Sequence, residues 1–280
     1  MQLNDTPVLP WESIQIMAVG DFQMGSAGFD AERLAKHLKW GVDHGVKFYG
    51  TGDYLDFLSP SNRRALRNAG LYDTALDLIE EWNEKHMREL ADVMKPTTGM
   101  WLGMHEGHHY YEFFDGTTTD TRLCNLLKAP FLGTAAITRI PFRDPKNRKR
   151  VDCHIWGHHG EGSGSANPIH RLLSVAPGFP QIDIFVQGHN TQLMARSLDT
   201  LEVYGKPGHL KLRNRTQLFV AAGGFMRGYE ANSKQGKVGR AQGSYVEKAM
   251  MRPSALGGPL ITVTPRDRGT FTQLDLKCSV

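Results

Sequence analysis

The chain has 280 residues, of which 40% are hydrophobic and 22% are charged, the composition of an ordinary soluble globular protein. This length allows one large domain or two small ones, and we expect a single domain over residues 1–280. The net charge of +4 is too small to require a nucleic-acid partner by itself. No apolar run approaches the ~20 residues that a membrane span needs.

The cysteines and the first residues indicate the compartment. Cys124, Cys153 and Cys278 are widely spaced and odd in number, which favours reduced thiols over a disulfide framework. Residues 1–11 are polar and interrupted by proline, without the basic and apolar segments of a signal peptide. We therefore expect a cytoplasmic protein without a membrane partner.

The first elements along the chain form a strand, a helix and a second strand. Residues 14–19 are a β-like apolar run, and Asp30 can cap a helix over residues 31–44. The next apolar and aromatic run begins at Val46 and breaks at Gly50. This order predicts a βαβ unit, whose two strands pair in parallel.

The rest of the chain continues this alternation before it becomes β-rich. Helices are expected from Ser59 onward and at 71–94, 121–127 and 168–175, and strands at 99–104, 133–142, 150–156 and 182–186. Further strands are expected at 192–204, 210–222, 260–264 and 270–276. We expect a motif-bearing α/β part at 12–192 and a β-rich second-sheet part at 193–280. Two flexible loops are expected, a Gly/Ser loop at 161–167 and a basic loop or lid at 223–245.

Acidic residues and histidines follow five of the predicted strands. They are Asp21, Asp53, the cluster at 105–109, the pair at 158–159, and His189. In an open α/β sheet, functional groups gather at the carboxyl ends of the strands, where carboxylates and imidazoles can hold a metal. We therefore expect a metal or catalytic centre, with Asp53, His158 and His189 as its principal members. This mixture of ligands suits Mn, Fe or Zn better than calcium.

The order of these motifs resembles the calcineurin-like metallophosphoesterases over residues 14–192. The matching segments are Gly20-Asp21-Phe22-Gln23, Gly52-Asp53-Tyr54-Leu55-Asp56, Gly103-Met104-His105-Glu106, His158-His159-Gly160 and Gly188-His189-Asn190-Thr191. The resemblance implies a four-layer α/β/β/α sandwich with two metal ions bridged by Asp53. It also implies that Asp21 binds the first metal, that His158 and His189 bind the second, and that His105 acts on the leaving group.

The sequence departs from the family pattern at three ligand positions. Gln23 and Thr191 stand where the family has histidines, and Met104 stands where it has an asparagine. This leaves a weakened first site, in which Gln23 still offers oxygen, and a better second site. A second register is open, in which Glu106 is a metal ligand and His108 is the catalytic imidazole.

The function implied is metal-dependent hydrolysis of phosphomonoesters or phosphodiesters, with one or two divalent ions. The chain has neither a phosphate-binding Gly-Lys-Ser/Thr loop nor a Gly-x-Ser-x-Gly elbow, which disfavours nucleotide-driven and serine-hydrolase chemistry. Basic residues concentrate at 139–150 and 206–248, with Tyr229 and Tyr245 available to stack on bases, so a nuclease or DNA phosphodiesterase is one specialisation. The other interpretation of the first concentration is a solvated hairpin turn at 144–147.

Two further hypotheses stay open. In the first, the replaced ligands mark a catalytically retired fold that binds nucleic acid or a protein partner. In the second, His105, His108 and His109 form an unrelated zinc hydrolase, although their spacing differs from the helical zinc-protease motif. The sequence leaves the oligomeric state and the metal identity open.

Overall fold

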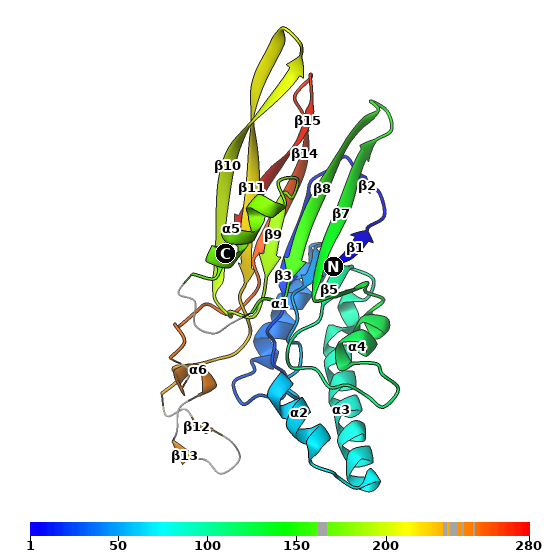
Figure 1. Cartoon of the computed structure of the whole chain (residues 1–280), viewed down its shortest axis with the longest axis vertical. Helices are drawn as coiled ribbons and strands as arrows, with labels where there is room; N and C mark the ends of the chain where they lie inside the picture. The colour runs from blue at the N-terminus through cyan, green and yellow to red at the C-terminus, as the bar shows by residue number, and fades with distance from the viewer. Residues whose placement is uncertain (162–166, 232–233, 236–239, 242–243, 249) are drawn as a thin grey trace.

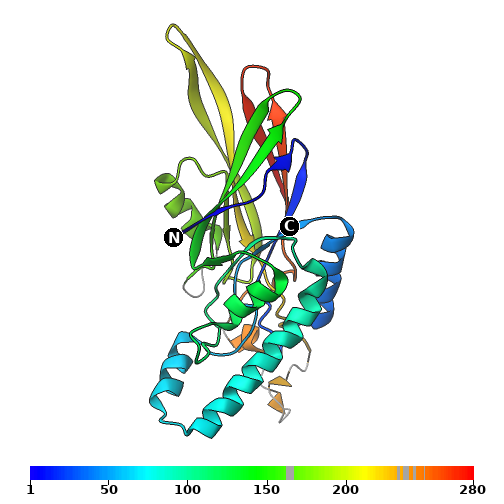
Figure 2. The same cartoon turned by 90° about the vertical axis from the view of Figure 1, so that its right-hand side faces the viewer.

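A computed structural model describes the chain except for residues 162–166, 232–233, 236–239, 242–243 and 249. The predicted Gly/Ser loop at 161–167 falls mostly on the first of these gaps, so that prediction lies outside the described residues. About a third of the predicted basic loop at 223–245 falls on the other gaps, and its described residues include two short strands at 234–235 and 240–241. The remaining chain forms two large sheets with helices on their outer faces (Figures 1 and 2).

The first sheet has the strand order β15-β14-β3-β4-β5-β6. Its members are β3 (Ile14–Val19), β4 (Lys47–Gly50), β5 (Trp101–His105), β6 (Phe131–Gly133), β14 (Leu260–Asp267) and β15 (Thr272–Ser279). Strands β3, β4, β5 and β6 pair in parallel, so their carboxyl ends meet at one edge. The predicted βαβ unit is confirmed by the parallel pairing of β3 with β4.

The second sheet has the order β1-β7-β8-β9-β11-β10, with β2 attached to β7. Its members are β1 (Gln2–Asp5), β2 (Leu9–Pro10), β7 (Ala135–Asp144), β8 (Lys149–His158), β9 (Ile184–Gln187), β10 (Leu193–Lys206) and β11 (His209–Ala222). Strands β14 and β15 of the β-rich part extend the first sheet beside β3, whereas β10 and β11 join the second sheet. The residues at 193–280 are therefore not a separate second sheet, because both sheets take strands from both parts of the chain.

The helices are α1 (Ala31–Asp43), α2 (Pro60–Asn68), α3 (Asp73–Met94), α4 (Thr119–Leu127), α5 (Ile169–Val175) and α6 (Tyr245–Lys248). Short 3₁₀ turns follow α3 and α5 at Lys95–Thr97 and Ala176–Gly178, and a small hairpin pairs β12 (Lys234–Gln235) with β13 (Arg240–Ala241). Asp30 caps α1 through a bond from the Arg33 amide, as the sequence predicts. Among the described helices, none combines the length and the apolar character needed to cross a membrane.

Three clusters of buried side chains hold the layers together. The first cluster joins α1, α3 and α4 to the outer face of the first sheet, with Leu34, Leu90 and Leu123 as members. The second lies between the two sheets, and the third packs α5 against the outer face of the second sheet. The order of layers is helices, sheet, sheet, helix, so the predicted fold class of an α/β/β/α sandwich is confirmed.

Candidate metal centre

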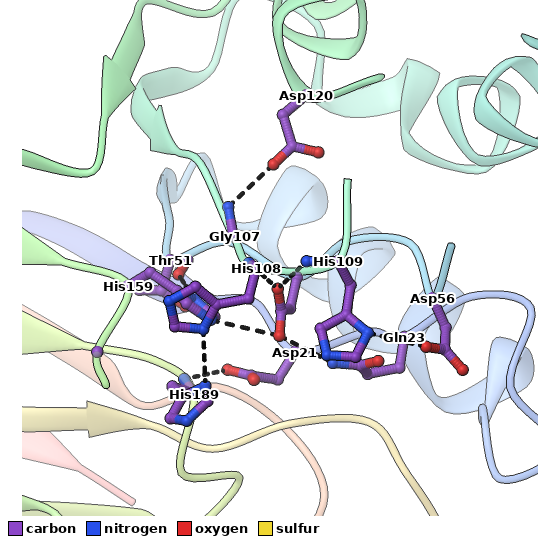
Figure 3. Close-up of polar contacts among 12 residues, drawn as sticks. Asp21, Gln23, Thr51, Asp56, Gly107, His108, His109, Asp120, His159 and His189 are labelled. Atoms are coloured by element: carbon purple, nitrogen blue, oxygen red, sulfur yellow. Dashed lines mark hydrogen bonds and ion pairs between the residues drawn. The ribbon is translucent and has the colours of Figure 1, made fainter. Parts of the chain in front are cut away.

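Five side chains from loops that follow strands of both sheets meet at one place (Figure 3). Asp21 follows β3, Asp53 follows β4, and His108 follows β5 in the first sheet, while His159 and His189 follow β8 and β9 in the second. Two groups within this set could hold a metal ion: His108 with His159 and His189, and Asp21 with Asp53 and His159. The ligand atoms of each group lie within 4.8 Å of one another. The site thus joins both sheets.

Asp53 is the most firmly held member. Its Oδ1 accepts hydrogen bonds from the backbone amides of His108 (2.5 Å) and His109 (3.1 Å), and its Oδ2 accepts one from Gln23 Nε2 (3.0 Å). Burial would raise the pKa of this carboxyl, but the neighbouring His159 outweighs burial and holds it below its usual range. Asp53 is therefore a buried, charged carboxylate in a fixed orientation.

His159 presents an unshared electron pair to that carboxylate. Its Nδ1 lies 2.7 Å from the carbonyl oxygen of Thr51, and because a carbonyl only accepts, Nδ1 carries the hydrogen. Its Nε2 lies 3.3 Å from Asp53 Oδ2 and has no hydrogen-bond partner. Two electron-pair donors at this separation require a cation between them, either a proton or a metal. A backbone carbonyl that fixes the ring in this way is a usual neighbour of metal-binding histidines.

The imidazoles of His108 and His189 lie beside that of His159 and form the first metal-binding group with it. His108 Nδ1 lies 3.4 Å from His189 Nδ1, and the His189 amide donates to Asp21 Oδ2 at 2.7 Å. Burial and the neighbouring His159 lower the pKa of His108 to about 4, so its ring is neutral and able to bind a metal near pH 7. Three imidazoles and two carboxylates suit Zn, Fe or Mn, so the residues present fit a divalent metal of this kind.

The backbone around the centre is strained. Non-glycine residues with positive φ occur at Asp21 (48°), Gln23 (53°), Asp53 (51°), His189 (67°) and Thr191 (23°), all in loops of the site. Such conformations cost of order 1–3 kcal/mol each and persist where surrounding contacts impose them. Their concentration here supports a functional role for these loops.

His109 lies beside the metal-binding groups and has its own carboxylate partner. Its Nδ1 lies 3.0 Å from Asp56 Oδ1, and its backbone amide contacts Asp53. Burial would lower the pKa of His109, but the bond to Asp56 and the charge of Asp53 outweigh it and raise the pKa above its ordinary value. These two carboxylates therefore favour the protonated form of His109.

The loop that carries His108 and His109 is fastened from two sides. The guanidinium of Arg63 in α2 donates from Nη1 to the carbonyls of Leu58, His108 and Tyr110 at 2.6, 2.8 and 3.0 Å. On the other side, Asp120 of α4 accepts from the Gly107 amide at 3.0 Å. Asp120 is buried, and burial raises the pKa of its carboxyl to about 7.

The structure places two of the histidines expected in the centre outside it. His158 is on the face of β8 that carries Trp156, with the two rings stacked at 5.8 Å, and its Nδ1 accepts from the Gly160 amide at 2.7 Å. Its neighbour His159 takes the expected place because successive strand side chains point to opposite faces. His105 is buried between the sheets, where its Nδ1 faces the Gly133 carbonyl and its Nε2 faces the Tyr49 hydroxyl, each at 3.0 Å. Both ring nitrogens thus face groups of the inter-sheet core.

The other expected ligands have different surroundings. Gln23 donates from its amide nitrogen to Asp53, so it helps to hold that carboxylate in place, and it belongs to neither metal-binding group of His, Asp and Glu residues. Glu106 is half-buried, its pKa is raised by burial, and it belongs to neither metal-binding group among the described residues. Met104 packs in the core beneath the helices. Of the residues named in the second register, His108 lies in a metal-binding group of the described residues and Glu106 does not, so neither register is matched in full.

The sequence interpretation did not place His159 among the principal ligands, gave His109 only to the alternative zinc hydrolase, and did not consider Asp120. The signal for His159 was available, because Trp156 marks the outer face of its strand and His158 shares that face by alternation. The signal for His109 was the second carboxylate of Gly52-Asp53-Tyr54-Leu55-Asp56, which needed a partner. Asp120 lies 13 residues beyond Gly107 and opens a helix, so no local pattern distinguishes it from an ordinary first-turn acid.

Comparison with known proteins gives weak structural likenesses. No protein-family model and no curated protein matches the sequence. Among solved structures, GAP50, the anchor in the inner membrane complex of Plasmodium, is 11% identical with a TM-score of 0.44, covering 95% of this chain and 84% of that one. Vps29 from Entamoeba histolytica complexed with Zn²⁺ is 10% identical with a TM-score of 0.34, covering 95% and 99%. An uncharacterized Streptococcus pneumoniae protein, described as a predicted phosphoesterase, is 11% identical with a TM-score of 0.32, covering 95% and 98%.

Proposed function

We propose that this chain is a metal-dependent phosphoester hydrolase of the calcineurin-like metallophosphoesterase type. The observation that carries the proposal is the contact between His159 Nε2 and Asp53 Oδ2, two electron-pair donors at 3.3 Å in a buried site. The ring of His159 is fixed by Thr51, and the carboxylate is fixed by two backbone amides, so both donors are oriented before a cation arrives. Such preorganisation is typical of a metal centre.

Each residue has a distinct task in this proposal. His108, His159 and His189 with Asp53 would hold one ion of Mn, Fe or Zn, and Asp21 with Asp53 would hold a second, weaker one. When bound, such ions supply positive charge that polarises a phosphoester and activates water. Gln23 keeps the Asp53 carboxylate in place by donating to Oδ2.

His109 would protonate the departing oxygen. Asp56 accepts from Nδ1 of this ring, which leaves Nε2 as the nitrogen that can hand a proton to the substrate. The raised pKa of His109 favours the protonated ring that this task requires. Proton donation at the leaving group is the step in phosphoester hydrolysis that a side chain can supply directly.

Phosphomonoesters and phosphodiesters are both candidate substrates, and DNA is one specialisation of the second. The structure favours the hairpin interpretation of the basic residues at 139–150, because Arg139 pairs with Asp5, Arg143 with Asp152 and Lys149 with Asp267. Nucleic-acid binding and a cytoplasmic location remain predictions.

A second function is favoured by one specific observation. A proton between Asp53 and His159 also satisfies both donors, since the carboxylate outweighs burial and raises the pKa of His159 to about 9. A chain that keeps the proton would be a retired fold that binds a partner without turnover. The two functions differ in whether a metal displaces that proton.

Metal content and hydrolysis, measured on protein purified without chelator, separate the two. We expect one or two equivalents of Mn, Fe or Zn in the native protein, and loss of metal and of metal-stimulated hydrolysis of p-nitrophenyl phosphate and its bis-ester in Asp53→Asn and His159→Gln. His158→Gln is the matched control and should keep both, because that ring lies outside the centre. Protein that contains no metal and takes up neither manganese nor zinc would refute the proposed enzyme.

A further inference from the structure

The hairpin of β10 and β11 rises beside the hairpins β7–β8 and β14–β15, and its tip extends beyond theirs; we call it the arm (Figures 1 and 2). Each of its strands has 14 residues, which at ~3.3 Å per residue carries the tip roughly 45 Å from the strand ends near the metal centre. The outer half of the arm has large aliphatic side chains in contact with solvent. They are Leu201 (70% exposed), Val203 (66%), Leu210 (71%) and Leu212 (63%).

These four side chains share one face of the arm. Val203 pairs directly with Leu212, Leu201 pairs with Asn214, and Gly205 pairs with Leu210. Paired residues in an antiparallel ladder point to the same side, so the four form one continuous patch interrupted only by uncharged positions. We call the patch of Leu201, Val203, Leu210 and Leu212 the arm face.

Side chains on the opposite face of the arm already have partners within the chain. Tyr204 packs on Phe271 of the β14–β15 hairpin with ring centroids 5.2 Å apart, and the Arg213 guanidinium lies over both rings. Arg213 and Arg215 pair with Glu202 at 2.8 and 3.3 Å. The strand pattern thus supports the arm from one side and leaves an uncharged aliphatic surface on the other.

We propose that the arm face is a homodimer interface, covered by the arm face of a second copy across a two-fold axis. Aliphatic side chains that are about two-thirds exposed give a patch of a few hundred Å², the size at which an exposed apolar surface marks an interaction site. Two such patches meeting face to face, with the polar residues around them, approach the ~1,000 Å² at which specific interfaces begin. A patch without charge meets its own copy without repulsion, as an isologous contact requires.

Beside the arm face, the arm has an open edge. Strand β10 is the last strand of its sheet, and β11 is its pairing partner among the described strands. Long apolar edge strands are usually shielded in proteins that stay monomeric. An interface at the low end of the size range predicts a concentration-dependent equilibrium between monomer and dimer, independent of the metal centre and of its activity.

Sedimentation velocity over a series of protein concentrations tests the proposal. We expect the mass of the native chain to rise from 31.3 kDa toward twice that value. Val203→Asp and Leu212→Asp should each weaken association by at least ~100-fold. Every dimer then loses two buried aliphatic side chains and brings two negative carboxylates into the interface, where they repel each other. Leu78→Asp is the matched control: this leucine of α3 is 66% exposed but far from the arm, so its substitution should leave the dimer intact.

Three outcomes would overturn the proposal. The native chain could stay monomeric at every concentration, or both arm variants could dimerise as the native chain does. The third is a monomer that co-sediments with anionic phospholipid vesicles through the arm face, since Lys206 and Lys211 lie near its tip. Equal thermal unfolding of all variants, expected for changes on an exposed surface, shows that a lost dimer is not a lost fold.

Discussion

Replacing Gly107 by alanine should detach Asp53 from the loop that holds it. A β-carbon at this position would lie 2.1 Å from the Asp53 amide nitrogen and 2.2 Å from its Oδ1. Carbon and nitrogen or oxygen atoms need about 3.5 Å, so the loop and Asp53 must separate by more than 1 Å. The same loop donates the His108 and His109 amides to Oδ1, and a shift of that size breaks both bonds.

The expected loss follows from those two bonds. A hydrogen bond to a charged group contributes about 1.5–3 kcal/mol, so losing both costs at least ~3 kcal/mol, or roughly 150-fold in metal affinity if the cost falls on binding. Calorimetric titration with Mn²⁺ and Zn²⁺ measures the affinity, and thermal unfolding measures the share that falls on stability.

Gly178→Ala is the control, because a β-carbon there meets no atom within 4 Å and the glycine has ordinary backbone angles. It should leave affinity and stability within experimental error of the native protein. Metal affinity within threefold of native in Gly107→Ala, with stability also unchanged, would show that Asp53 is not held by this loop.

Three further predictions concern protons. Asp56→Asn should move the alkaline limb of kcat/KM to lower pH, because Asp56 raises the pKa of His109 and the active acid is then lost earlier; an unmoved limb would remove His109 from that role. Metal binding near pH 8 should release close to one proton, since the metal displaces the proton of His159, whose pKa is about 9 without it, and calorimetry in buffers of different ionisation enthalpy should show that release vanish well above pH 9. Burial lowers the pKa of His105 from 6.5 to about 3, so the neutral ring contributes its full share of folding stability above pH 6.5. As the pH falls, the unfolded chain binds a proton that the folded chain does not, and the free energy of unfolding should be ~2 kcal/mol lower at pH 5. Urea unfolding at pH 7.5 and 5.0 should show this loss, and His105→Gln should lack it.

The sequence predicts the strands and the loops that follow them because both depend on local chemistry. Apolar runs bounded by glycine identify β3, β4 and β5 to within two residues at either end, and the acids and histidines beyond them are read directly. The convergence of these loops follows from parallel pairing, since it places the carboxyl ends of the strands together. The local pattern gives the strands and their following loops, and parallel pairing then places the candidate centre at the carboxyl edge of the sheet.

The direction of each side chain depends on partners that no local pattern contains. Whether His158 or His159 enters the centre depends on which face of β8 meets α5, and that is set by Trp156 packing with residues of α5. The arrangement of β14 beside β3 likewise depends on a pairing between residues almost 250 positions apart, so the expected division into a motif part and a second-sheet part could not anticipate it.

The stretch from His105 to His109 shows how one run of similar residues comes to serve different tasks. The pairing register of β5 with β6 shifts between Met104 and His105, and the ring of His105 turns into the inter-sheet core. Space for it exists because Gly157 lies opposite: a β-carbon there would come within 2.3 Å of His105 Nε2 and 2.1 Å of the Tyr49 hydroxyl.

After His105, whose ring is buried in the core, the chain leaves the strand and turns at Gly107. Gly107 lies so close to Asp53 that there is no room for a side chain. The next two amides then face the same carboxylate oxygen, so the rings of His108 and His109 diverge, one toward His189 and the other toward Asp56. A ring with a pKa lowered to about 4 and a ring whose pKa is raised thus stand side by side. Burial and the neighbouring His159 lower the pKa of His108, whereas the bond to Asp56 and the charge of Asp53 raise that of His109. In the proposed function, the division between metal ligand and proton donor therefore follows from the turn at Gly107, since both residues are histidines and only their partners distinguish them.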